Sequence, residues 1–161
     1  MLGGSRSGKS RYAEKILSAE APPWIYIATA QAFDDEMRTR IAAHQARRAA
    51  GWRTVEVPIA LPDALLREGD GPVLVDCLTL WLTNLILDGH DVDQATSALE
   101  DALITRRATT VLVSNEVGLG LVPDTPLGRT FRDAAGVLNQ RIAACAGHVR
   151  FMVAGLPLSL K

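Results

Sequence analysis

The chain has 161 residues, of which 48% are hydrophobic and 22% are charged, so it holds enough apolar material for one domain with a full core. Its 17 Lys and Arg residues nearly balance 18 Asp and Glu residues, which excludes a nucleic-acid binder that relies on a general basic field. The most apolar stretch, LTLWLTNLILDG, contains Thr and Asn and is too short to span a membrane. We therefore expect neither a nucleic-acid partner nor a membrane span.

Short strand-like runs alternate with longer helix-like stretches along the whole chain. Strands are expected at 24–28, 52–57, 72–76, 109–114 and 149–154, and helices at 9–19, 34–49, 78–87, 91–107 and 125–146. Most of the strand candidates are continuous apolar runs, as is typical of strands that are buried on both faces. The pattern predicts a single α/β domain over residues 1–161, with a mostly parallel central sheet.

The first predicted helix follows GGSRSGKS, which matches the phosphate-binding pattern G-x-x-x-x-G-K-[ST] with Gly3, Gly8, Lys9 and Ser10 at the fixed positions. In such a loop, main-chain N–H groups and the start of the helix face phosphate oxygens. Lys9 is expected to reach the β- and γ-phosphates, and the hydroxyl of Ser10 to contact Mg²⁺. A chance match in a turn rich in Gly and Ser is the alternative, but the helix that follows favours nucleotide binding in a P-loop NTPase-like, three-layer fold.

Only Met1 and Leu2 precede this loop, whereas strands usually have about five or six residues. The strand that leads into a phosphate loop is central in such sheets, and its neighbours would otherwise leave main-chain groups unpaired. We therefore predict that the first strand is truncated and that the natural chain begins a few residues upstream.

A second magnesium ligand is expected at the end of another buried strand. VLVD, at 73–76, ends in Asp76 and fits this description. The alternative is that Asp76 caps the helix that follows, which is a common role of aspartate.

His44 lies on the predicted helix 34–49, on the border of an apolar stripe, with Arg40, Arg47 and Arg48 three or four residues away. Three guanidinium groups would keep the imidazole neutral and attract a polyphosphate. A neutral imidazole can attack an α-phosphate and form a nucleotidyl-histidine. The alternative is a packed histidine at the edge of the core with no chemical role.

The two cysteines, Cys77 and Cys145, lie far apart in the sequence and fit no metal-binding spacing. We expect both to be ordinary core residues in a protein of the reducing cytoplasm.

Six sequence blocks together resemble a known family, and they run in order along essentially the whole chain: GGSRSGKSRYAE, YIATAQAFDDEMRTRIAAHQARR, WRTVEVP, DCLTLWLTNL, VSNEVGLGLVP and FRDAAGVLNQRIA. The set is similar to the bifunctional adenosylcobinamide kinases and adenosylcobinamide-phosphate guanylyltransferases of cobalamin biosynthesis. This resemblance implies a doubly wound fold and a trimer. It also implies that ATP or GTP phosphorylates adenosylcobinamide, and that GTP then transfers GMP to the product.

The resemblance also implies roles for individual residues. In the family the GMP transfer proceeds through a guanylylated histidine, and the matching residue here is His44, which follows Ala43 and so has no adjacent histidine. The positions that match the family's GTP contacts are Gly3, Gly4, Ser5, Arg6, Ser7, Gly8, Lys9, Ser10, Ala28, Thr29, Ala30, Gln45, Ala46, Arg47, Arg48 and Glu56. The carboxylate of Glu56 could accept N–H groups from a guanine edge. From its place in the strand alone, Glu56 would be an outward-facing carboxylate without a role.

Two other functions remain open at this stage. The chain could be a small-molecule kinase in which His44 only packs, or a nucleotide-dependent binding module. The absence of a guanine-reading NKxD motif argues against the second. The segment 118–128 contains several glycines and two prolines and predicts a long loop, a kind of segment that often has a function. The spacing assigns no role to Asn115 and Glu116, which lie beside it.

Overall fold

The computed structural model describes residues 1–31, 35, 39 and 50–161, and the predicted helix 34–49 lies largely outside this part. Along the chain the elements are β1 (Leu2–Gly3), α1 (Lys9–Leu17), β2 (Trp24–Ala28), β3 (Trp52–Glu56), α3 (Leu61–Arg67), β4 (Val73–Asp76), α4 (Leu78–Leu87), α5 (Val92–Thr105), β5 (Thr110–Asn115), α6 (Pro126–Cys145), β6 (Arg150–Val153) and β7 (Leu156–Ser159). The five predicted strands and the four predicted helices outside 34–49 are confirmed, with ends that shift by at most two residues.

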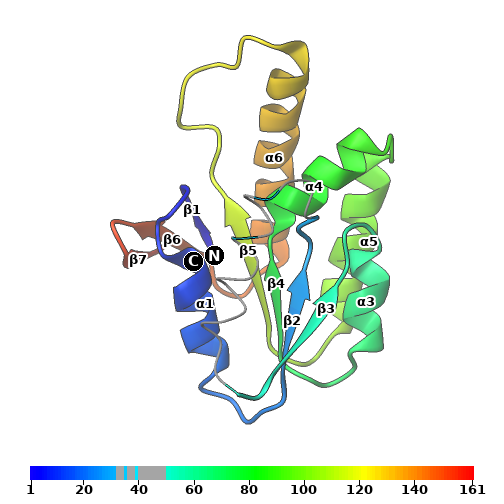
Figure 1. Cartoon of the computed structure of the whole chain (residues 1–161), viewed down its shortest axis with the longest axis vertical. Helices are drawn as coiled ribbons and strands as arrows, with labels where there is room; N and C mark the ends of the chain where they lie inside the picture. The colour runs from blue at the N-terminus through cyan, green and yellow to red at the C-terminus, as the bar shows by residue number, and fades with distance from the viewer. Residues whose placement is uncertain (32–34, 36–38, 40–49) are drawn as a thin grey trace.

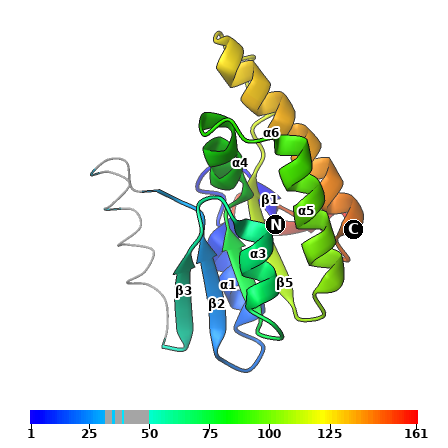
Figure 2. The ribbon, with the colours of Figure 1, turned by 90° about the vertical axis from the view of Figure 1, so that its right-hand side faces the viewer.

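In the described part of the chain, the strands form one sheet in the order β3-β2-β4-β5-β1-β6-β7. Every pairing is parallel except that of β6 with β7. Helix α1 covers one face of the sheet, and α3, α4, α5 and α6 cover the other (Figures 1 and 2). The predicted α/β fold with a mostly parallel sheet between helical layers is therefore confirmed.

The central strands are buried because alternate side chains enter two separate cores. In β2, Ile25 and Ile27 face the larger core, which α3, α4, α5 and α6 cover, whereas Tyr26 packs in the smaller core with α1. In β4 the same alternation places Leu74 in the smaller core. Asp76, two residues further on, is thereby directed toward the face that α1 covers.

The first strand is as short as predicted. Residues Leu2 and Gly3 pair with β5 on one side and β6 on the other. The Met1 carbonyl accepts a hydrogen bond from the Ser114 N–H, and the terminal ammonium of Met1 donates to the Leu112 carbonyl over 2.8 Å. These pairings place the start of the phosphate loop between β5 and β6.

Two elements were missed in the sequence. Helix α3 has a proline in its first turn and buries Leu61 and Leu65 at helical spacing, which is a recognisable helix signal in seven residues. Strand β7 contains Pro157 and is exposed along its length, as an edge strand permits. Among the described residues, no helix combines the length and the apolar character that a membrane crossing requires.

Candidate nucleotide-binding site

The carboxyl ends of five parallel strands bring the predicted site residues to one edge of the sheet. Ala28 of β2 lies between Glu56 of β3 and Asp76 of β4 in the strand register. On the other side of β4, Asn115 of β5 lies opposite Gly3 of β1, where the phosphate loop begins. Residues that are far apart in the sequence therefore line the edge where ligands of open α/β sheets bind.

The phosphate loop needs glycine at two of its positions. Gly3 has φ of 152°, and a Cβ there would lie 2.9 Å from the Met152 carbonyl oxygen and 2.7 Å from the Ser7 hydroxyl. Gly8 precedes α1 as its N-cap residue with φ of 92°, in the left-handed region that side chains disfavour. The two glycines let the loop turn sharply and deliver the start of α1 to the edge of the sheet.

Two polar side chains of this loop are buried. Lys9 is only 8% exposed, and its Nζ donates to the Gly4 carbonyl oxygen over 2.8 Å. The Ser7 hydroxyl is buried and has no hydrogen-bond partner among the described residues. A buried ammonium group and an unsatisfied hydroxyl in a glycine loop fit the oxygens of a phosphate chain, because both can donate to them.

Asp76 is held by a tyrosine of the neighbouring strand. The Tyr26 hydroxyl donates to Asp76 Oδ2 over 2.8 Å. The alternative role of Asp76 as the cap of α4 is wrong, because the N-cap residue is Cys77 and no side chain caps that helix end. The carboxylate is only partly buried and lies on the sheet face that α1 covers.

The donor set here fits a magnesium ion that arrives with a nucleotide. Helix α1, which begins with Lys9 and Ser10, packs against β4 and β5, so the Ser10 hydroxyl and the Asp76 carboxylate belong to the same face of the sheet. The described residues contain no group of three or more His, Cys, Asp or Glu side chains that could hold a metal. Magnesium in phosphate sites typically takes one or two protein oxygens and completes its shell with phosphates and water.

A buried polar network fixes the end of β2 to the start of α4. The Thr29 hydroxyl donates to the Cys77 carbonyl oxygen over 2.7 Å and accepts from the Cys77 N–H over 2.8 Å. The Asn84 amide donates to the Thr29 and Pro58 carbonyl oxygens over 2.9 and 3.0 Å. These bonds hold the main chain directly after Asp76 in place.

Comparison with known proteins places the chain in a family. The family model described as cobinamide kinase / cobinamide phosphate guanyltransferase matches residues 1–160. The chain belongs to this family. The bifunctional adenosylcobalamin biosynthesis protein CobP of Pseudomonas aeruginosa is 51% identical to it, covering 100% of this chain and 95% of the relative. The corresponding CobU proteins of Salmonella typhimurium and Escherichia coli are 40% and 42% identical, and in each comparison 100% of this chain and 98% of the relative are covered.

The predicted site of this family member is only partly described by the structure. The phosphate loop, Ala28, Glu56 and Asp76 come together at the carboxyl edge of the sheet, and Glu56 is exposed there. Thr29 is fully buried, and its hydroxyl is occupied by Cys77, so a GTP contact by this residue stays a prediction. The predicted nucleophile and its neighbours lie outside the described residues: His44, Gln45, Ala46, Arg47 and Arg48.

Sequence reasoning missed Tyr26 and Asn84 as members of this site. Asn84 has a recognisable signal, because an amide within the apolar helix LTLWLTNLIL must find buried partners. Tyr26 has no such signal, since its partner Asp76 lies fifty residues further along the chain.

The thiol of Cys77, next to Asp76, is unreactive. Burial, with a smaller contribution from the neighbouring Asp76 carboxylate, raises the pKa of Cys77 to about 11. The thiol is therefore protonated at neutral pH and takes no part in nucleophilic chemistry.

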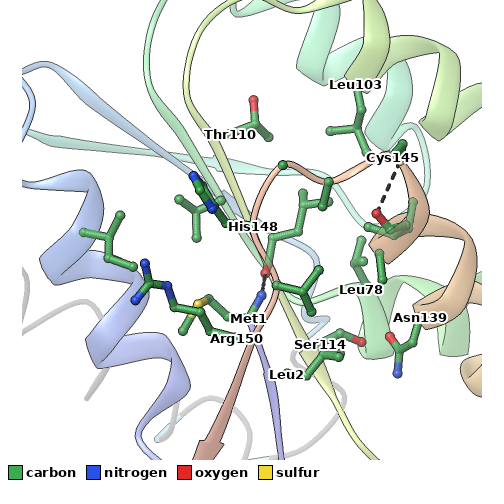
Figure 3. A pocket seen from close by; sticks show the side chains of 18 of the residues that line it. Met1, Leu2, Leu78, Leu103, Thr110, Ser114, Asn139, Cys145, His148 and Arg150 are labelled. Atoms are coloured by element: carbon green, nitrogen blue, oxygen red, sulfur yellow. Dashed lines mark hydrogen bonds between the residues drawn. The ribbon is translucent and has the colours of Figure 1, made fainter. Parts of the chain in front are cut away.

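A cavity of about 390 Å³ lies beside β5, which lines it from its amino end as far as Ser114. Figure 3 shows Met1, Thr110, His148 and Arg150 around it, and all four come from the beginnings of β1, β5 and β6 or from just before them. The face of α6 that carries Cys145 closes another side. None of the phosphate-loop residues 3–10 lines the cavity, so it is not part of the nucleotide site.

The segment after β5, to which the sequence assigned no role, is hydrogen-bonded to the start of the phosphate loop. The Glu116 N–H donates to the Gly3 carbonyl oxygen over 3.1 Å, and the Glu116 carboxylate accepts from the Gly118 N–H over 2.6 Å. The loop that follows exposes Leu119, Leu121 and Val122. Residues 115–118 thus form a turn that supports the start of the phosphate loop.

Proposed function

We propose that this chain catalyses both reactions of its family, the phosphorylation of adenosylcobinamide and the transfer of GMP to adenosylcobinamide phosphate. The proposal is supported most strongly by the phosphate loop and Asp76 at one sheet edge in a chain that matches the family model over residues 1–160. The names of the relatives, which describe bifunctional adenosylcobalamin biosynthesis proteins, support the same two-step function.

In the first reaction, the hydroxyl oxygen of the aminopropanol arm attacks the γ-phosphorus of ATP or GTP. A new P–O bond forms as the bond to the β-phosphate oxygen breaks, the hydroxyl proton is released, and a nucleoside diphosphate leaves. Lys9 and the loop N–H groups offset the phosphate charge. Ser10 and Asp76 would hold Mg²⁺, which supplies further charge neutralisation when it is bound.

In the second reaction, a neutral nitrogen of His44 attacks the α-phosphorus of GTP and expels pyrophosphate. The phosphate oxygen of adenosylcobinamide phosphate then attacks the same phosphorus and breaks the N–P bond, which gives adenosyl-GDP-cobinamide and frees the histidine. Arg47 and Arg48 are proposed to offset the charge of the departing pyrophosphate. Gln45 and Ala46 are proposed to contact the nucleotide.

Glu56 is proposed to read the guanine base. Its exposed carboxylate stands at the carboxyl end of β3, beside Ala28 in the register, and can accept two N–H groups of a guanine edge. We also propose a trimeric assembly, which the family resemblance implies. A cytoplasmic location is proposed because the reactions consume nucleoside triphosphates and because both cysteines of the described residues are free rather than paired in a disulfide.

The deciding experiment separates the two activities. The purified chain is incubated with α-labelled GTP, and His44→Ala is compared with His90→Ala, a histidine of an exposed turn. We expect acid-labile label on the wild-type chain and on His90→Ala, none on His44→Ala, and measurable kinase activity in all three. Label on His44→Ala would overturn the assignment of the nucleophile.

The same assay distinguishes the other functions. A simple small-molecule kinase would phosphorylate adenosylcobinamide and carry no label. A nucleotide-dependent binding module would form neither product.

A further inference from the structure

We propose that Tyr26 is a positioning residue of the phosphoryl-transfer site, where its hydroxyl orients the Asp76 carboxylate toward the magnesium ion of the bound nucleotide. This inference rests on the proposed function, since it deepens the metal role that was assigned to Asp76. It concerns the partly buried hydrogen bond between Tyr26 and Asp76 Oδ2, 2.8 Å long.

The strand register explains why these two side chains meet. Asp76 lies opposite Ala28, so Tyr26, two residues earlier in β2, is its diagonal neighbour on the same face of the sheet. Diagonal neighbours in a sheet are within reach of long aromatic side chains. The phenol therefore reaches the carboxylate from the neighbouring strand and bonds to its Oδ2.

The tyrosine ring is itself fixed. Tyr26 is 4% exposed and packs with Leu74 and with Ala13 and Leu17 of α1. Its ring also meets Trp52 edge to face, with centroids 6.1 Å apart and an angle of 77°. A donor held this firmly restricts the rotation of the carboxylate that it binds.

Such a contact has a specific chemical effect. A hydrogen bond to one oxygen of a metal-binding carboxylate fixes its orientation before the metal arrives, and removal of such a partner typically costs about 10- to 100-fold in metal affinity. The same loss does not affect the loop and the lysine, which bind the phosphates directly. The effect of Tyr26 should therefore concern the metal and not the nucleotide.

The test measures metal binding without turnover. Mn²⁺ replaces Mg²⁺, a non-hydrolysable GTP analogue occupies the site, and free Mn²⁺ is followed by electron paramagnetic resonance. For Tyr26→Phe we expect the dissociation constant of Mn²⁺ to rise about tenfold or more. The affinity for the analogue without metal should stay within about twofold. Replacement of residue 26 by 4-fluorophenylalanine, which keeps the volume but cannot donate, should give the same result.

The matched control is Tyr12→Phe, which removes the same atom from a tyrosine that bonds Arg150 instead of Asp76. It should leave the Mn²⁺ affinity unchanged. In a double-mutant cycle, the effect of Tyr26→Phe should vanish in the Asp76→Asn background, since the two groups act as one unit.

The outcomes separate this inference from the function on which it rests. Weak Mn²⁺ binding by both Asp76→Asn and Tyr26→Phe supports the proposal. Weak binding by Asp76→Asn alone overturns the role of Tyr26 and leaves the metal role of Asp76 intact. Unchanged binding by both overturns the metal role of Asp76, and the role of Tyr26 with it.

Discussion

The hydroxyl of Thr29 bonds to both main-chain groups of Cys77, donating to its carbonyl oxygen and accepting from its N–H. This pair of bonds joins the end of β2 to the residue that follows Asp76. Because Asp76 and Cys77 are adjacent, the position of the carboxylate depends on a contact that the carboxylate does not make.

Thr29→Val should therefore destabilise the fold although it keeps the shape of the side chain. The buried Cys77 N–H would lose its acceptor, and an unsatisfied buried group costs about 2 kcal/mol. Urea unfolding followed by circular dichroism measures the loss.

The control is Thr83→Val in α4, where the hydroxyl bonds to the Thr79 carbonyl oxygen of its own helix and to no other group in the described part of the chain. Its free energy of unfolding should change by less than about 0.5 kcal/mol. Equal losses in the two variants would contradict the special role of the contact between Thr29 and Cys77.

The framework of the fold follows from local patterns, and this part was predictable. Buried parallel strands such as 73–76 are short apolar runs, and long helices such as 126–145 show helical periodicity, so both are visible without tertiary information. The phosphate loop is also local, because eight consecutive residues carry its whole pattern.

The contacts that arrange the site were not predictable in the same way. The hydrogen bond of Tyr26 with Asp76 and the bonds of Thr29 with Cys77 exist only because β2 and β4 are neighbours in the sheet, while β3 intervenes in the sequence. Periodicity assigns a residue to a strand, but it does not say which strand lies beside it. The partners of a polar side chain near a strand end thus depend on topology.

Alanine substitutions at the first two glycines of the phosphate loop should differ in their effect on stability. Gly3→Ala introduces a Cβ 2.9 Å from the Met152 carbonyl oxygen at a φ of 152°, whereas a Cβ at Gly4 meets nothing within 4 Å. We expect Gly3→Ala to lower the free energy of unfolding by about 2 kcal/mol and Gly4→Ala to change it by less than about 0.5 kcal/mol. Thermal unfolding of both variants, scanned under identical conditions, gives the comparison. Equal stability would show that β1 tolerates a side chain at its end.

The two thiols should differ sharply in reactivity. The expectation that both cysteines are core residues is wrong for Cys145, which is exposed near the end of α6, whereas Cys77 is 5% exposed with a pKa raised to about 11, mainly by burial. In a native chain at pH 8, a disulfide reagent should modify Cys145 and leave Cys77 unmodified until urea unfolds the protein. In Cys145→Ser the native reaction should disappear. Rapid modification of Cys77 in the folded chain would contradict its burial.

A surface ion pair between α5 and α6 should make stability depend on pH. Arg141 Nε donates to Glu100 Oε1 over 3.0 Å, and Nη2 donates to Oε2. These bonds lower the pKa of the Glu100 carboxyl below its usual 4.5 in the folded chain. The folded state therefore binds this proton less readily than the unfolded state, so the contribution is complete above pH 4.5 and is lost as the pH falls through the lowered value.

Arg141→Met should consequently unfold at lower urea concentration than the wild type at pH 7, and the two midpoints should converge as the pH falls below 4.5 and through the lowered pKa of Glu100. The difference should be modest, since both side chains face solvent, and it should shrink in high salt. Glu100→Gln serves as the control, because it removes the titrating group and should lose most of this pH dependence. A gap between Arg141→Met and the wild type that stays constant over this pH range would mean that Arg141 stabilises the helices through the packing of its aliphatic stem or through its hydrogen bond to the Ser97 hydroxyl, since neither contact depends on the protonation of Glu100.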